Sequence, residues 1–306
     1  MTVQNIYNNL LEQAEKLFRH NRQGSYKTRL RYKEGFRRFL QYLAEHYRTQ
    51  RLANISPEHF KSYAQYMQLC GKSASTIKTD LAAIRFWHDQ IPNAKHKLPP
   101  NSELDLEKRQ FGGVDRTWSL GEYNKMVALA WKASREDIAA CIAIAWHTGL
   151  RIHEVVKIDT AAARRALKAR NITIRGKGGR VRDVELDEAA ADELRRWLKR
   201  TRPGYKLFVP KEKQSHQVIR EIQDFIREYR DEAGDEEREA RMTFHGTRHS
   251  YAARQYEQMI HAGRGDLGTK LRVSQNLGHG RADVTNLYLA SLSKKKTPPK
   301  GGGGDV

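Results

Sequence analysis

The segment Leu277-Gly278-His279-Gly280-Arg281-Ala282-Asp283-Val284-Thr285-Asn286-Leu287-Tyr288 is the feature around which the chain is organised. It ends in a tyrosine that follows a histidine by nine positions, on a short run that we expect to be helical. A lone tyrosine is usually a core aromatic residue whose hydroxyl finds a hydrogen-bond partner. Whether Tyr288 has a chemical role therefore depends on the polar residues elsewhere in the chain.

Three earlier segments supply such residues: Thr148-Gly149-Leu150-Arg151, Gly176-Lys177-Gly178-Gly179 and His245-Gly246-Thr247-Arg248. Attack on a DNA phosphodiester builds negative charge on the non-bridging oxygens, which two guanidinium groups can hold in fork geometry. A lysine or an imidazolium can protonate the leaving 5′ oxygen, and a tyrosine hydroxyl can be the nucleophile. Because a covalent tyrosyl bond stores the bond energy, we expect no metal, no cofactor and no ATP. The candidate catalytic residues are Arg151, Lys177, His245, Arg248, His279 and Tyr288.

The composition points to a polyanionic partner. The chain has 306 residues, enough for one large or two modest domains, and 39% of them are hydrophobic. Lysine and arginine number 56 against 36 acidic residues, which gives a net charge of +20 shared by the N-terminal third and the remainder. Such a surplus is typical of proteins that bind nucleic acid. The alternative is a soluble basic protein with no nucleic-acid role, since net charge governs association and not fold.

Other classes of protein find little support in the sequence. Cys70 and Cys141 are isolated, and we expect both to be small core residues of helices in a reducing compartment. No cysteine and histidine cluster has zinc spacing, and no apolar run reaches the roughly 20 residues that span a bilayer. The polar N-terminus shows no signal peptide. These features predict a cytoplasmic, nucleoid-associated protein with no membrane contact.

Two short motifs suggest other chemistry but lack its context. His245 and His249 are four residues apart, a spacing that can seat a metal, yet Gly246 occupies the place of the general-base glutamate. The run Gly263-Arg264-Gly265-Asp266-Leu267-Gly268 matches the dinucleotide-binding pattern by letter, but it follows a helical pattern instead of a strand. We therefore expect no metal site, and we interpret the second motif as a glycine-rich loop.

Residues 1–92 have the pattern of a compact bundle of four helices. Apolar residues recur at helical spacing in residues 3–20, and a second helix carries a basic face opposite its apolar stripe. A third helix begins at Ser56-Pro57, and a fourth begins near Ser75. The amides, hydroxyls and lysines at the start of the fourth helix can seat a phosphate, although Ser75 can equally be only a cap and the lysines solvated. The candidate DNA-binding residues are Lys72, Ser73, Ser75, Lys78 and Arg85.

The region that follows predicts a linker. Residues 93–116 have little periodicity and contain Pro99-Pro100 and Gly112-Gly113, which interrupt regular structure. A flexible linker would let two DNA-binding domains close around a duplex as a clamp. We therefore divide the chain into residues 1–92, the linker, a second domain at 117–292 and a low-complexity tail at 293–306, which we expect to be disordered.

The second domain opens with helices capped by Ser119 and Ser134. The second of them is apolar almost all round, which predicts a buried helix, and Gly149 is suited to end it. Arg151 follows at once, and a charge beside a core element needs a partner or a ligand. The alternative is that Arg151 and Glu154 form an ordinary helical pair on the surface.

A β-hairpin is expected next. Residues 171–175 and 181–186 alternate as strands, and a glycine-rich turn between them places Lys177 near the tip. Glycines would let this turn approach another surface closely, although a solvated turn lysine is the commoner case. Further helices are expected at 188–200 and 215–230, and the acidic run 231–239 is expected to be a solvated loop or helix end.

In order and local sequence, these segments resemble the tyrosine recombinase (phage integrase) family. The match is carried by His147-Thr148-Gly149-Leu150-Arg151-Ile152-His153-Glu154, Arg175-Gly176-Lys177-Gly178-Gly179-Arg180, Phe244-His245-Gly246-Thr247-Arg248-His249-Ser250 and the run that ends at Tyr288. The resemblance covers about residues 115–292 and extends to about residues 25–92. It implies a mainly α fold with a small β-sheet, in which a SAM-like four-helix core-binding domain precedes a mixed α/β tyrosine-recombinase catalytic domain.

The resemblance also implies a reaction, a site-specific cutting and rejoining of DNA through a 3′-phosphotyrosyl intermediate and a Holliday junction. It implies double-stranded DNA as partner, a homotetramer on synapsed sites, and a possible directionality or accessory DNA-bending factor. Mobile-element integration is the typical setting. In the implied roles, Arg151 and Arg248 grip the scissile phosphate, Lys177 protonates the leaving oxygen, His245 is the general acid/base, His279 hydrogen-bonds the phosphate, Glu154 orders the site and Tyr288 is the nucleophile.

Two departures from the family pattern stand out. The segment from Gln255 to Lys270 looks lengthened, and the chain starts almost at its first helices, which we interpret as the lack of a separate arm-binding domain. Two alternative functions stay open: a type IB topoisomerase-like enzyme, which would relax supercoils without a specific site, and a non-catalytic DNA-binding relative. The presence of every catalytic residue type disfavours the latter.

Overall fold

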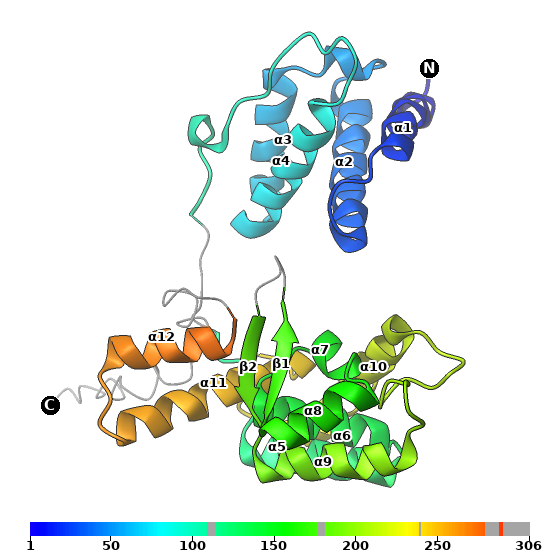
Figure 1. The fold of residues 1–306 in the computed structure, drawn as a ribbon. Helices are drawn as coiled ribbons and strands as arrows, with labels where there is room; N and C mark the ends of the chain where they lie inside the picture. The colour runs from blue at the N-terminus through cyan, green and yellow to red at the C-terminus, as the bar shows by residue number, and fades with distance from the viewer. Residues whose placement is uncertain (109–113, 177–180, 239, 279–287, 290–306) are drawn as a thin grey trace, which may run out of the picture. The chain divides into compact units, whose positions relative to one another are not determined.

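The computed structural model describes residues 1–108, 114–176, 181–238, 240–278 and 288–289. The chain divides into two compact units, Met1–Phe111 and Gly112–Val306. The described residues are mainly helical with one two-stranded sheet, which confirms the predicted fold class (Figure 1). No helix in the described ranges is long and apolar enough to cross a membrane.

The first unit contains the four expected helices, each begun by a capping side chain. They are α1 (Val3–His20), α2 (Tyr26–His46), α3 (Pro57–Leu69) and α4 (Ala74–His88), with two short 3₁₀ turns, η1 (Leu52–Asn54) and η2 (Asn101–Glu103). Their buried faces form one aromatic-rich core that includes Phe36, Phe39 and Trp87. The expected cap of α4 was wrong, because the hydroxyl of Ser73, not of Ser75, accepts from the backbone N–H of Thr76 at 3.2 Å.

A buried carboxylate joins α2 to α4. The side chain of Asp80 is fully buried and accepts hydrogen bonds from the guanidinium of Arg38 at 2.9, 3.0 and 3.1 Å, while Arg31 forms a second ion pair with it. Gly35 leaves room for this group, since a Cβ there would lie 3.1 Å from Asp80 Oδ1. The pair of arginines is thereby fixed on the basic side of the unit.

The described part of the expected linker packs on the first unit. Leu98, Leu104 and Leu106 cover its core, and the backbone N–H of Lys95 donates to the Ala53 carbonyl at 3.1 Å. The apolar residues in this segment are too few and too irregularly spaced to give a periodic signal. The composition predicted a flexible linker. In the structure, the described part of this segment is held on the first unit by tertiary contacts.

The second unit is built around α6, which is buried on all sides. Helices α5, α9 and α11 surround it, and the remaining elements extend this core (Figure 1). The elements are α5 (Leu120–Lys132), α6 (Glu136–Thr148), α7 (Ile152–Val156), α8 (Thr160–Ala169), β1 (Asn171–Arg175), β2 (Val181–Glu185), α9 (Glu188–Arg200), α10 (Ser215–Ala233), α11 (Phe244–His261) and α12 (Asp266–Asn276).

Several local predictions for this unit can be scored. The cap at Ser119 and the glycine that ends α6 are confirmed, and the structure extends the Ser119 cap to a capping box with Glu122. The expected cap and near capping box at Ser134 were wrong, because Arg135 holds the N-cap position and Ser134 has a left-handed φ of 57°. Cys141 is buried as expected, whereas Cys70 is exposed just beyond the end of α3.

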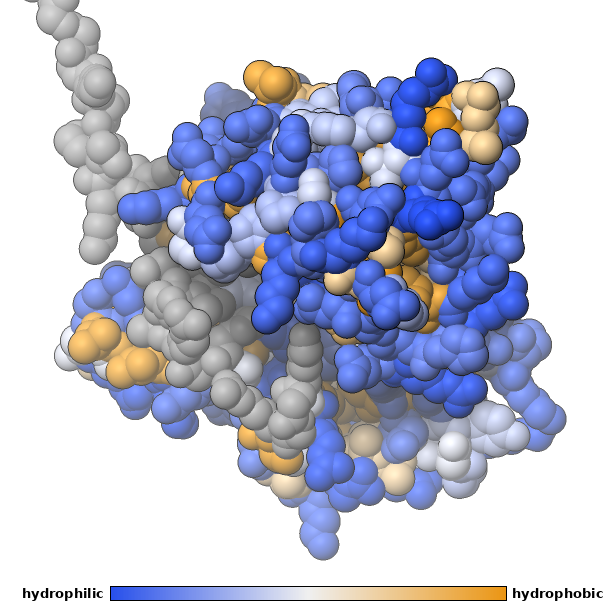
Figure 2. All heavy atoms as spheres, turned by 90° about the horizontal axis from the view of Figure 1, so that it is seen from above, coloured by the Kyte–Doolittle hydropathy of each residue, from blue (hydrophilic) through white to orange (hydrophobic). Residues whose placement is uncertain are grey.

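The hairpin is confirmed as an antiparallel pair, with Asn171 opposite Glu185 and Arg175 opposite Val181. Its turn, with Lys177, lies outside the described residues, as do the expected helical run 279–287 and the tail. The glycine motif at 263–268, expected to be a loop, is a loop only in its first half, because α12 begins at Asp266. Hydrophilic side chains cover most of the face shown in Figure 2, in keeping with the 30% of residues that are charged.

Candidate active site

The turn that ends α6 can accept only glycine. Gly149 has a φ of 64°, and a Cβ at this position would lie 2.4 Å from Cδ1 of Tyr251 on α11. The missing side chain therefore lets the turn close against α11. Leu150 is buried next, and Arg151 occupies the N-cap position of α7. The chain thus holds Arg151 between two helices of the core.

Glu154 is the buried centre of this turn. Its carboxylate accepts from the Arg151 guanidinium at 3.2 Å and from the Arg151 backbone N–H at 2.8 Å. The side chain of Glu154 is only 4% exposed while that of Arg151 is 28% exposed, so the pair is not the surface pair that sequence left open. Burial alone would raise the pKa of Glu154, but its hydrogen bonds with Arg182 and with the Arg151 backbone lower it to about 2.

Arg182 is a site residue that the sequence prediction missed. It lies on β2, its side chain is 8% exposed, and it makes two hydrogen bonds to the Glu154 carboxylate, at 2.7 and 3.1 Å. It also lies against Gly278, where a Cβ would be 3.0 Å from the Arg182 Cδ. A signal was present, because strand alternation places Arg182 on the same face of β2 as the buried Val184.

Arg248 connects the two motif turns of the site. Its side chain is almost fully buried, and its guanidinium donates to the carbonyl of Gly149 at 2.6 Å and to the carbonyl of Leu277. The same guanidinium lies 5.7 Å from the ring centroid of Tyr288. Burial, and then the nearby charge of Arg151, lower the pKa of Arg248 to about 10, so it remains a cation at neutral pH.

Tyr288 lies among two histidines of α11. Its ring centroid is 5.8 Å from that of His245 and 4.5 Å from that of His249, and the tyrosine is 6% exposed. Burial first, and nearby charges second, lower the pKa of His245 to about 4 and that of His249 to about 3. Both imidazoles are therefore neutral at pH 7, and a neutral imidazole can accept a proton.

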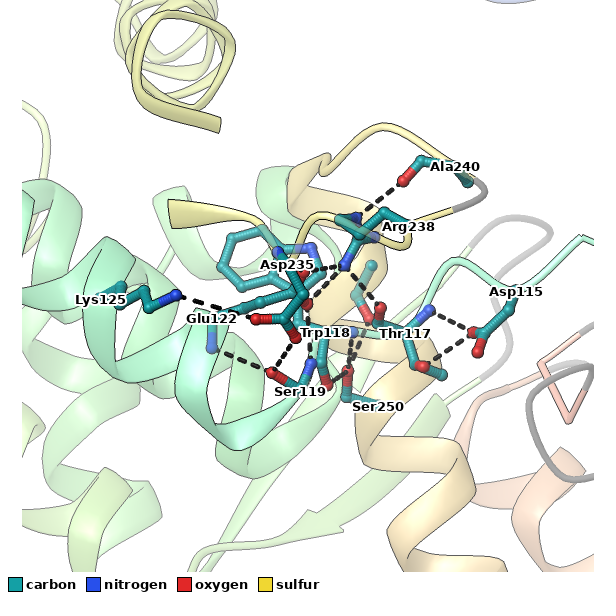
Figure 3. Close-up of polar contacts among 11 residues, drawn as sticks. Asp115, Thr117, Trp118, Ser119, Glu122, Lys125, Asp235, Arg238, Ala240 and Ser250 are labelled. Atoms are coloured by element: carbon teal, nitrogen blue, oxygen red, sulfur yellow. Dashed lines mark hydrogen bonds and ion pairs between the residues drawn. The ribbon is translucent and has the colours of Figure 1, made fainter. Parts of the chain in front are cut away.

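A separate buried ion pair fastens the start of this unit (Figure 3). The carboxylate of Glu122 on α5 accepts from the Arg238 guanidinium at 2.5 Å, from the Ser119 backbone N–H at 2.8 Å and from the Asp235 backbone N–H at 2.9 Å. Next to it, the Ser250 hydroxyl accepts from the Trp118 backbone N–H at 2.7 Å. In the acidic run 231–239, α10 ends at Ala233 and the described acidic side chains are exposed, as expected, while Arg238 ties the loop to the core.

The predicted DNA-contact residues of the first unit have local partners. Lys78 donates to the Glu107 carbonyl at 2.7 Å, and Arg85 donates to the Pro99 carbonyl and to Asn101. Ser73 caps α4, Ser75 lies in its first turn and Lys72 is exposed. Their contacts with DNA stay a prediction.

The structure gathers four of the six predicted catalytic residues, Arg151, His245, Arg248 and Tyr288, in one region with Glu154. The other two, Lys177 and His279, lie outside the described residues. Across the residues that the structure describes, no group of three or more His, Cys, Asp or Glu side chains could hold a metal ion. The gathered groups are suited to bind a phosphate and to exchange a proton with a tyrosine hydroxyl.

Residues 121–295 match the phage integrase family, and residues 14–90 match the SAM-like N-terminal domain of phage integrases. The chain belongs to the phage integrase family. This membership makes it an enzyme of the tyrosine site-specific recombinase type.

Three proteins similar to this integrase family member share between 15% and 23% identity with it. The tyrosine recombinase XerD of Bradyrhizobium diazoefficiens is 23% identical over 79% of this chain and 80% of its own length. The Tn1549 transposon integrase bound to transposon right end DNA has a TM-score of 0.59 at 16% identity, over 97% of this chain and 99% of that one. A lambda integrase from a tetramer bound to a Holliday junction has a TM-score of 0.61 at 15% identity, over 94% and 77% of the two chains. These likenesses show a shared fold.

Proposed function

We propose that this protein cuts and rejoins DNA at a specific site, with Tyr288 as the nucleophile of a 3′-phosphotyrosyl intermediate. The observation that carries the proposal is the setting of Tyr288, whose ring lies 5.7 Å from the Arg248 guanidinium and 5.8 Å from the His245 ring. A cation beside the nucleophile favours attack on a phosphate, and a neutral imidazole can take up the hydroxyl proton.

The chemical step forms one bond and breaks another. The Tyr288 oxygen bonds to phosphorus, the bond from phosphorus to the 5′ oxygen breaks, and the tyrosine proton passes to His245. Lys177 supplies the proton that the leaving 5′ oxygen takes up, and His279 hydrogen-bonds a phosphate oxygen. The 5′ hydroxyl of a partner strand then reverses the reaction, so the bond energy is kept and neither ATP nor metal is consumed.

Arg151 and Arg248 hold the non-bridging oxygens during this step. Their charges add to the lowering of the His245 pKa, which keeps that imidazole neutral and ready to accept a proton. Glu154 and Arg182 fix the Arg151 side chain from behind. The fixed arginines therefore bind the phosphate first, and the tyrosine proton then passes to His245, whose imidazole is already neutral.

The proposal extends to assembly and partners. We expect double-stranded DNA to bind both units, the first through its basic side, and four copies to exchange strands through a Holliday junction, as in the tetramer seen for lambda integrase. The proposed setting is a cytoplasmic, nucleoid-associated mobile element, in which an accessory DNA-bending or directionality factor can assist. Because phosphate contacts dominate, affinity should fall steeply with salt.

The test begins with the site. Sequences that the protein captures from a random duplex library would be made into substrates nicked near the point of cleavage, so that the released fragment diffuses away. The wild type should form a covalent protein–DNA adduct, and Tyr288→Phe should form none while it retains binding. Equal adduct formation by Tyr288→Phe would disprove the nucleophile, and relaxation of supercoiled plasmids that lack a site would favour a type IB topoisomerase instead.

A further inference from the structure

A cleft of about 430 Å³ opens beside the candidate active site. It runs from the turn before α7 to the C-terminal half of α10. Helices α7 and α10 pack against each other (Figure 1). Arg151 and His245 line one end of it, so the cleft is continuous with the groups assigned to the scissile phosphate. Its volume is that of a small-ligand site, not of a packing defect.

The lining of this cleft is cationic. Side chains of α7, α10 and α11 and of the segments just before α7 and α11 line it, and none of the lining residues is acidic. A cleft with charges of one sign above low-dielectric walls concentrates the field and attracts the opposite charge. The lining residues with a guanidinium, imidazole or amide side chain are Arg151, His153, Gln223, Arg227, Arg230 and His245.

Two of the arginines come from α10 and have no role in the proposed chemistry. Arg227 and Arg230 are three residues apart and therefore lie on one face of the helix. Arg230 is 21% exposed, its contact with Asp231 is long at 3.7 Å, and its buried Nε has no hydrogen-bond partner among the described residues. Arg227 is 64% exposed and pairs with Asp224 at 2.7 Å. The Nε is shielded from solvent, so a ligand in the cleft would meet the exposed part of the Arg230 side chain, which lines the cleft and has only a long ion pair to compete for it.

We propose that this cleft binds the DNA backbone phosphate next to the scissile one, with Arg230 as its main contact and Arg227 as its second. The inference rests on the proposed function, because it takes the scissile phosphate to lie at Arg151 and Arg248. Guanidinium groups suit a phosphodiester, since they present paired donors to its two charged oxygens. The subsite would fix the strand on one side of the cleaved bond, so that the reacting phosphorus faces Tyr288.

The test uses a generic 30-base-pair duplex of arbitrary sequence as the probe and measures affinity as a function of salt. Each lost phosphate contact lowers the slope of log K against log salt by about 0.9. We expect Arg230→Gln and Arg227→Gln each to lower the slope by up to this amount. Arg220→Gln is the matched control, because Arg220 is on the same helix, is 85% exposed and does not line the cleft.

The control separates a local contact from a general loss of charge, since all three variants lose one positive charge. Far-UV circular dichroism would check that Arg230→Gln folds, and the exposed Arg227 gives a second variant with little structural risk. A slope for both cleft variants equal to that of Arg220→Gln would overturn the subsite. If the slope falls as expected but the wild type forms no adduct on any selected site, Arg230 and Arg227 still bind a backbone phosphate, while the proposed function, and with it the position of that phosphate next to a scissile one, fails. The reverse pattern supports the function and rejects the subsite.

Discussion

Two carboxylates in the second unit are buried against arginines, and they differ in what those arginines do. Glu122 is 1% exposed, and Arg238, itself 15% exposed, is the cation paired with it, along with backbone N–H donors. Glu154 is 4% exposed and is shared by two arginines, Arg182 at 8% and Arg151 at 28% exposure. The first group closes a structural joint, whereas the second holds a cation that lines a cleft.

The difference shows that a buried ion pair does not by itself mark a site. At Glu122 the carboxylate and the Arg238 guanidinium pair with each other. The other donors to the carboxylate are backbone N–H groups of a loop and of a helix start. At Glu154 the buried Arg182 neutralises the carboxylate from behind, so Arg151 is positioned and still reaches the cleft. What distinguishes the candidate site is that one arginine of the buried group, Arg151, also lines a cleft.

The largest effect is expected where the pair is purely structural. Arg238→Met should lower the free energy of unfolding by about 3–5 kcal/mol, because it leaves the buried Glu122 without its cation. Chemical denaturation followed by circular dichroism would measure this. DNA cleavage per folded molecule should be unchanged at a temperature where the variant is folded, and a large loss of cleavage there would contradict the separation of the two groups.

A smaller effect is expected from the pH dependence of Glu154. Its pKa is about 2 in the folded protein against an ordinary value of 4.5, so its stabilising effect is full above about pH 4.5 and is lost as the pH falls towards 2. At neutral pH the shift corresponds to the order of 3 kcal/mol.

Comparison with Glu154→Gln isolates this contribution from that of the other carboxylates. The difference in unfolding free energy between wild type and variant should shrink as the pH is lowered from 6 to 3. A difference that stays constant over that range would mean that Glu154 does not titrate as inferred.

The smallest effect on stability, and the sharpest test of the comparison, comes from one substitution made in both groups. Arg182→Lys and Arg238→Lys each keep the positive charge but lose the planar guanidinium with its several N–H donors. This should cost about 1 kcal/mol of stability in each case. Only Arg182→Lys should slow covalent adduct formation, by up to about 100-fold, because Arg151 would shift relative to the phosphate. Equal cleavage rates for the two variants would remove Arg182 from the positioning of the site.

Much of this arrangement could be predicted from the sequence because its determinants are local. The helical periodicities, the cap at Ser119, the glycine that ends α6 and the β-hairpin each depend on residues a few positions apart. The nearness of Arg151 and Arg248 was a prediction from family resemblance. In the structure Arg248 donates to the carbonyl of Gly149, two residues before Arg151, and lies against the ring of Tyr288.

The rest depends on contacts between distant segments. Arg182 acts through Glu154, 28 residues earlier, and Glu122 is paired with Arg238, 116 residues later. The caps at Ser73 and Arg135 moved by one or two residues, because several neighbouring positions could begin each helix. The sequence predicted a linker at residues 93–116. The few leucines that pack residues 93–108 on the first unit are irregularly spaced, so they leave no periodic pattern that could have indicated this packing.

The two hydrogen bonds from Arg248 to the carbonyls of Gly149 and Leu277 have a consequence for genetics. Both acceptors are main-chain atoms, so no side-chain replacement at either position can delete them. Arg248 is the one partner of the three whose side chain a codon change can remove, and its loss would loosen two turns at the same moment as it removed a cation from Tyr288. An inactivating mutation of Arg248 would therefore lower both the stability of the fold and the rate of the chemical step. Measuring the free energy of unfolding together with the cleavage rate would separate these two effects.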